Sequence, residues 1–183
     1  MKKTILCCLL LSCLVFVGCN GLNDAEVEKI LAEKKVYPKD VEVVLFRNTE
    51  ADVKRLIEKG LVKEGLVTAQ AKHTIDDVGK PLIYFTEKAT PYLLPTSDTL
   101  KSFDEQRIRV GIEYLLRVVK IEMNPAGNKA LVDYITNVKE QTPFAVLYPG
   151  DLNVEHERRT SFSLTNSGWQ WDGRVIKMPG KQN

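Results

Sequence analysis

Apolar and polar residues alternate along the second half of the chain, and this alternation limits what that half can fold into. The alternating residues are Ile108, Val110, Ile112 and Tyr114; Val119, Ile121 and Met123; Ala130, Val132, Tyr134 and Thr136; and Thr160, Phe162 and Leu164. Successive side chains of a strand point to opposite faces of a sheet, so this period predicts strands with one apolar face. Turn-forming residues at 124–128 and 166–168 separate these strands. Residues 105–183 are therefore predicted to form an antiparallel β-meander of four to five strands.

Three details refine this prediction. The alternation slips near Leu115 and Leu116, which predicts a β-bulge or a buried middle there. Residues 144–148 form a short apolar run closed by Pro149 and predict a short strand. Trp169 and Trp171 predict a last strand.

The first half has helical signals instead. Asn23 or Asp24 can cap a helix that runs to about Lys35, and residues 41–46 predict a short strand. Thr49, with Asp52 three residues later, predicts the start of a second helix. Gly60 stands where a left-handed helix end is expected.

Residues 49–94 predict a helix, a hairpin (strands at 66–74 and 82–86, turn at 76–80) and a short helix. The segments Glu58-Lys59-Gly60-Leu61-Val62 and Tyr84-Phe85-Thr86-Glu87-Lys88 resemble the wing region of winged-helix domains, which implies a small winged-helix-like hairpin. The polar segment 95–104 is the predicted linker between region 19–94 and sheet region 105–183, unless 19–183 form one compact domain. The helices would cover the apolar face of the sheet, which predicts an α+β fold.

The N-terminus predicts export. Lys2 and Lys3 precede an apolar run of about 13 residues, Ile5 to Val17. This run is too short to span a bilayer comfortably. Its length and the preceding lysines are typical of a signal peptide, predicted here over residues 1–18. The following Phe16-Val17-Gly18-Cys19 resembles the lipobox of bacterial lipoproteins, in which signal peptidase II cleaves before a Cys that is lipidated. Gly18 and Cys19 match that motif, whereas Phe16 stands where Leu or Val is usual. This resemblance implies an acyl anchor on Cys19 and a place in the cell envelope, on the periplasmic side or the cell surface, with the outer membrane favoured in a Gram-negative host.

Removal of such a signal changes the composition of the mature chain. All four Cys lie at positions 7, 8, 13 and 19, so the mature chain would have no thiol apart from the lipidated one. Loss of Lys2 and Lys3 lowers Lys plus Arg from 26 to 24, equal to the 24 Asp plus Glu. A balanced surface gives no general attraction to nucleic acid, and the membrane contact is expected through acyl chains.

Few residues in the sequence are candidates for catalysis or metal binding. His156 lies between Glu155 and Glu157, which suits either a metal corner or, as we favour, a solvated loop, and His73 lies near two aspartates. Neither a nucleophile motif nor a phosphate-binding glycine pattern is present in the sequence. No catalytic residue, metal site or cofactor is therefore expected.

Two groups of residues are candidates for ligand binding. The first is basic, and its members are Arg107, Arg109, Arg158 and Arg159, with Arg117 and Lys120 nearby. These cations form either a positive stripe or, as we favour, cross-strand pairs with Glu105, Glu113 and Glu122. The second is Trp169 with Trp171, which share a strand face and form either an aromatic platform or, as we favour, part of the core.

The sequence thus predicts a lipid-anchored envelope protein that acts as a non-enzymatic binding or adaptor module, its partner an envelope protein or a cell-wall glycan. The alternative is an enzyme that acts on an envelope polymer through a carboxylate and His156. A nucleic-acid-binding winged helix is a remote third reading, because export and the mixed charge of residues 50–65 oppose it.

Overall fold

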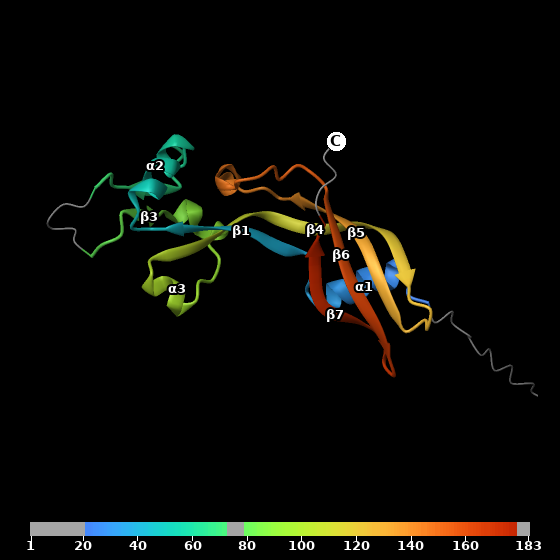
Figure 1. Ribbon diagram of the computed structural model, residues 1–183. Coiled ribbons are helices and arrows are strands. Elements are labelled where there is room, and N and C mark those ends of the chain that lie inside the picture. Colours follow the sequence, from blue (N-terminus) through green and yellow to red (C-terminus); the bar gives the residue numbers. More distant parts are fainter. Residues whose placement is uncertain (1–20, 73–78, 179–183) are drawn as a thin grey trace, which may run out of the picture.

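The computed structural model describes residues 21–72 and 79–178 and shows a mixed fold in which strands dominate (Figure 1). In chain order the elements are α1 (Asp24–Glu33), β1 (Lys39–Phe46), α2 (Glu50–Glu58), β2 (Val67–Ala69), β3 (Ile83–Phe85), the 3-10 helix η2 (Glu87–Tyr92), α3 (Asp98–Ser102), β4 (Glu105–Met123), β5 (Lys129–Lys139), the 3-10 helix η3 (Pro143–Leu147), β6 (His156–Thr165) and β7 (Gly168–Lys177).

The main sheet has five strands in the order β1-β4-β5-β6-β7, and every neighbouring pair is antiparallel. Strands β4 to β7 follow one another as a meander, and β1 joins the free edge of β4 from the first half of the chain. Strands β2 and β3 form a separate two-stranded sheet. The predicted α+β class with an antiparallel meander is therefore confirmed.

Strand β4 is 19 residues long and connects the two ends of the molecule. Residues 105–113 pair with β1, whereas residues 112–123 pair with β5. The β4–β5 register shifts between Leu115 and Arg117, where the bulge was predicted, and again between Val118 and Lys120. Bulges bend a strand and increase its twist, which accounts for the curled sheet in Figure 1.

A further bulge lies earlier in β4 and corrects the predicted alternation. Val41 and Glu42 are neighbours on β1, but they face Gly111 and Arg109, so Val110 is an extra residue. The extra residue reverses the alternation of the following side chains. Beyond it Gly111 and Glu113 are buried, whereas Ile112 and Tyr114, which the alternation placed on the apolar face, are only half-buried.

The residues that the structure describes form two apolar clusters. The α1 core is formed by Leu22, Val27, Ile30, Leu31, Val36, Tyr37, Ala130, Val132, Tyr134, Phe162 and Trp169. The α2 core is formed by Val43, Leu45, Val53, Leu56, Leu61, Leu66, Val67, Leu82, Ile83, Ala89, Ile108, Val110, Val138, Phe144, Leu147 and Leu152. Figure 1 shows α1 at one end of the curled sheet and α2, β3 and α3 at the other.

The predicted helix signals work as expected at both α1 and α2. The side chain of Asn23 accepts a hydrogen bond from the Glu26 N–H, and that of Thr49 accepts one from the Asp52 N–H. Asp52 in turn accepts a hydrogen bond from the backbone N–H of Phe46, which ties α2 to the end of β1. Gly60 has a φ of 81°, the left-handed conformation that its position predicted.

Further segments differ from the sequence prediction, and the first is the strand predicted at 66–74, of which the structure shows only β2, Val67–Ala69. Residues 143–147 form η3 rather than a strand, because Thr142 caps the turn, Pro143 occupies its start and Phe144 and Leu147 bury one face at a spacing of three. The predicted linker 95–104 contains α3, whose cap is Ser97, and it leads directly into β4. Residues 1–20 with Cys19, most of the predicted hairpin turn, and His73 with both nearby aspartates lie outside the described residues.

Gly111 provides a test of how closely the strands pack. A Cβ at this position would lie 2.6 Å from Val138 Cγ1 and 3.2 Å from the carbonyl oxygen of Lys139. We expect Gly111→Ala to lower the free energy of unfolding by about 1–3 kcal/mol, as overpacking does, when measured by urea denaturation. The control is Gly21→Ala, since a Cβ at Gly21 would meet nothing within 4 Å. Equal effects of both substitutions would contradict this account.

Candidate functional site

A cluster of charged and polar side chains lies between the two apolar cores, and we call it the polar waist. Its members are Lys39, Glu113, Thr136, His156, Arg158 and Lys177. The sheet register places them on neighbouring strands, because Lys39 faces Glu113, Thr136 faces His156 and Arg158 faces Lys177. All but Thr136 line a hollow of about 220 Å³.

The carboxylate of Glu113 is the centre of the waist. Its Oε1 accepts hydrogen bonds from Thr136 Oγ1 at 2.5 Å and from Arg158 Nη2 at 2.8 Å. Its Oε2 lies 3.1 Å from Lys39 Nζ. Glu113 and Arg158 are 4% and 8% exposed, so both charges are withdrawn from water and depend on each other.

These contacts determine the protonation state of Glu113. Burial alone would raise the pKa of this carboxyl, but the hydrogen bond from Thr136 and the charges of Lys39 and Arg158 outweigh burial and leave the pKa below its ordinary value. Glu113 is thus ionised at neutral pH. A carboxylate in this state stabilises positive charge and is poorly suited to donate a proton.

Two tyrosines close the waist on the α1 side. The hydroxyl groups of Tyr37 and Tyr134 lie 3.3 Å apart, and their rings meet edge to face. Burial raises the pKa of both phenols, which keeps them neutral. The α1 core and the polar waist therefore share these two side chains.

His156 is part-buried at the start of β6, not in the solvated loop that its neighbours in the sequence indicated. Burial, and then the positive charge of Arg158, lower the pKa of its imidazole, so it is neutral at pH 7. Its neighbour Glu155 points elsewhere and forms a two-pronged pair with Arg117. Within residues 21–72 and 79–178, no group of three or more His, Cys, Asp or Glu side chains is placed to hold a metal ion.

The predicted basic residues are spread over several ion pairs and do not form one stripe. Arg107 donates from Nε to Glu42 Oε2 at 2.9 Å, and Arg109 lies 3.6 Å from Asp40.

Arg159 donates two hydrogen bonds to Asp133, and Arg158 forms an ion pair with Glu113 in the polar waist. Of the acidic partners predicted for this group, Glu113 pairs with Arg158, and Glu122 pairs with Lys120 on the same strand. Arg158 is therefore the member of the basic group that the structure brings into the hollow.

The two tryptophans lie in and beside the α1 core. Trp169 is 7% exposed, and Trp171 packs against the core as a half-buried side chain. The indole Nε1 of Trp171 donates to Thr160 Oγ1 at 2.7 Å, and that hydroxyl donates to the carbonyl oxygen of Arg174 at 2.6 Å. Trp169 is therefore part of the α1 core, and Trp171 packs against it.

Sequence reasoning missed Lys39, Thr136 and Lys177 as members of the site. Thr136 is fully buried on an otherwise apolar face of β5, between Tyr134 and Val138, and that position was a signal that a buried polar partner was needed. Lys39 and Lys177 stand at strand ends and carried no signal of their own.

Comparisons of the chain with protein-family models, with curated proteins and with solved structures gave no significant match. What the site can do is therefore argued from its own geometry.

The role of Glu113 can be tested by stability against pH. At pH 7 we expect Glu113→Gln to cost about 3 kcal/mol, because Arg158 and Lys39 lose their carboxylate. Folding lowers the pKa of Glu113, so its stabilisation is complete above the ordinary pKa of 4.5 and is lost as the pH falls through the folded-state pKa. The difference between the variant and the wild type should therefore shrink on acidification, as measured by urea unfolding from pH 7 to pH 3. The matched control, Glu155→Gln in a half-exposed pair, should change little. A difference that stays constant with pH would contradict the ion-pair origin.

Proposed function

We propose that this protein is a lipid-anchored component of a bacterial cell envelope and acts as a non-enzymatic binding or adaptor module. The anchor would be the acylated Cys19 of the lipobox-like segment, which lies outside the described residues. Among those residues, no helix is both long and apolar enough to cross a bilayer. The proposal therefore assigns membrane attachment to the acyl chains.

The burial of Leu22 is the observation that carries the proposal furthest. Leu22 is 7% exposed within the α1 core, and α1 begins two residues later at Asp24. Only three residue steps separate Leu22 from Cys19, and an extended chain of that length covers at most about 10 Å. A lipid on Cys19 would thus hold the α1 end of the molecule against the bilayer surface.

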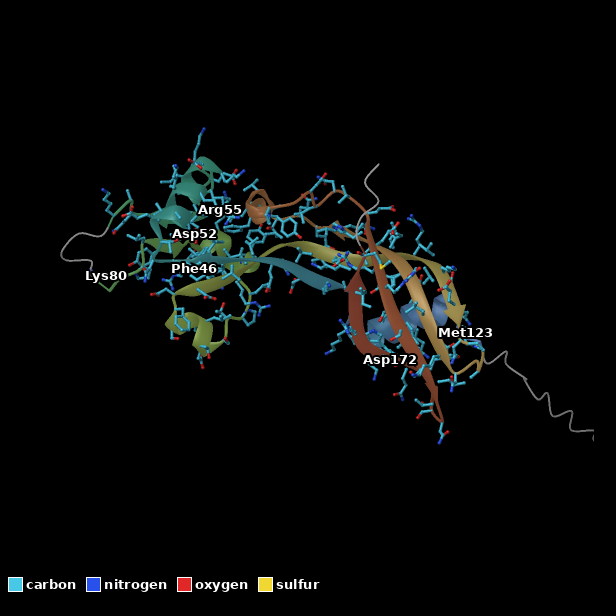
Figure 2. All side chains as sticks on the ribbon, viewed as in Figure 1. Phe46, Asp52, Arg55, Lys80, Met123 and Asp172 are labelled. Carbon is cyan, nitrogen blue, oxygen red and sulfur yellow. The ribbon has the colours of Figure 1, made fainter. Side chains whose placement is uncertain are left out.

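The opposite end would then face away from the membrane. Figure 2 places Phe46, Asp52 and Arg55 at the α2 end and Met123 at the α1 end. The α2-end elements expose large apolar side chains: Phe46 at 44%, Ile57 at 52%, Tyr84 at 41% and Phe103 at 66%. Apolar side chains on a projecting end favour contact with another envelope protein over contact with a cell-wall glycan.

A second candidate function, an enzyme acting on an envelope polymer, is favoured by one observation. Glu113 and His156 line the same hollow, together with Asp40 and Glu42. Acid–base hydrolysis needs a carboxyl that keeps its proton near neutral pH, and the lowered pKa of Glu113 opposes that role. Binding is therefore the function that the geometry supports better.

The anchor is tested by Cys19→Ala in the full-length chain expressed in bacteria. We expect the wild type in the membrane fraction and the variant released from it, because the acyl chains are the proposed attachment. Cys13→Ala serves as the control, since it removes a thiol from the same apolar segment and leaves the lipobox-like residues intact. Retention of Cys19→Ala in the membrane would contradict the lipid anchor.

The binding end is tested by crosslinking in cells followed by mass spectrometry of the captured proteins. We expect Ile57→Ser and Phe103→Ser to reduce the yield of one captured envelope protein severalfold, because both side chains are more than half exposed at the α2 end. Val119→Ser is the matched control, because Val119 is 59% exposed on the part of β4 that pairs with β5. Loss of the captured protein with Val119→Ser alone would place the contact elsewhere and overturn this assignment.

A further inference from the structure

We propose that the hollow of the polar waist is a binding site for a small oxyanion, of the carboxylate or phosphate class. The inference stands apart from the membrane anchor and from the partner at the α2 end. It rests on charge, on an unsatisfied donor and on the shape of the hollow.

The first observation is an excess of cations over available carboxylates. Lys39, Arg158 and Lys177 line the hollow, and Glu113 is the carboxylate that contacts the first two. Asp40 and Glu42 also line the hollow, but each carboxylate is paired with its own arginine, as the pairs Glu42–Arg107 and Asp40–Arg109 show. Lys177 forms no ion pair with any residue in 21–72 or 79–178. The waist therefore carries positive charge that its own residues leave uncompensated.

The second observation concerns Arg158, whose side chain is 9% exposed. Its Nη2 donates to Glu113 and its Nη1 donates to the backbone carbonyl of Glu157 at 3.3 Å. Its Nε is buried and has no hydrogen-bond partner among the described residues. A buried donor without an acceptor costs free energy, and a guanidinium is the side-chain group best matched to a carboxylate or phosphate. Because Nε is withdrawn from solvent, an oxyanion would reach it only if the guanidinium turned toward the hollow.

The third observation is that the hollow has room for such a group. Its volume of about 220 Å³ is many times the roughly 15 Å³ that one water molecule requires. Lys39 and Lys177 are exposed at its mouth, whereas Glu113, Arg158 and the nearby Thr136 are buried. An oxyanion that enters between the two lysines would meet Arg158 and a neutral imidazole, His156, and Glu113 would hold the guanidinium in place. The carboxylate is thus a positioning group for the arginine.

The experiment is a titration of the purified full-length chain, in detergent, with inorganic phosphate and with acetate at constant ionic strength maintained by chloride. Calorimetry should detect saturable binding of at least one of the two oxyanions, and thermal unfolding should shift upward with its concentration. Lys177→Gln removes a cation at the mouth without touching the Glu113 network, and it should weaken binding about five- to tenfold. Lys129→Gln removes the same charge from the far end of β5 and should leave the affinity unchanged.

A second variant separates charge from geometry. Arg158→Lys keeps the positive charge beside Glu113 but removes the fork, so it should fold, as judged by circular dichroism, and lose most of the oxyanion affinity. The proposal is overturned if neither phosphate nor acetate binds saturably. It is also overturned if Lys177→Gln and Lys129→Gln weaken binding equally, because that result would mean screening of the general surface charge.

Discussion

A carboxylate that is taken out of water must be neutralised where it lies, and this requirement at Glu113 organises the centre of the molecule. The neutralising groups come from β1 and β6, and a hydroxyl from β5 completes the set, so four strands of the sheet meet at one side chain. A slip of either register by one residue would turn a charged partner to the other face. The contacts of Glu113 are thus compatible with one register of β1, β4, β5 and β6, and the α1 core and the α2 core lie on either side of them.

The parts of the fold that could be predicted are those whose sequence signals lie within a few residues of the element itself. Strands β5 and β6 followed from the alternation at 130–136 and 160–164, and β7 followed from Trp169 and Trp171, with turn residues within a few positions of them. The bulge at Val110 could not be predicted, because it exists relative to Val41 and Glu42, which are far away in the sequence. For η3, the local signal of Thr142 and Pro143 was present, but the apolar run that follows it equally suits a strand.

The site was harder to predict than the fold for the same reason. Glu113 falls among arginines in the sequence, and that setting indicates a solvated cross-strand pair rather than a buried charge. Its inward direction depends on the Val110 bulge, and its partners Lys39 and Arg158 come from strands that no sequence pattern brings together. Gly111 adds a second condition, because any Cβ there would collide with Val138 on β5. The buried position of Glu113 therefore requires both the bulge at Val110 and the absence of a Cβ at position 111.

The same long strand that carries Glu113 also connects the two ends to which different roles are proposed. Residues 105–113 of β4 support the α2 end, and residues 112–123 support the α1 end, so the strand passes through the polar waist where the two pairings overlap. The ion pairs of Glu113 with Lys39 and Arg158 therefore lie at the point of β4 that joins the two ends. An oxyanion that satisfies Arg158 and balances Lys177 would strengthen the contacts among β1, β4 and β6 at that point. A ligand that binds the ordered waist more tightly than a disordered one favours the ordered state in proportion to the difference in affinity. Binding in the hollow would thus be linked to the rigidity of the α2 end relative to an α1 end held at the membrane.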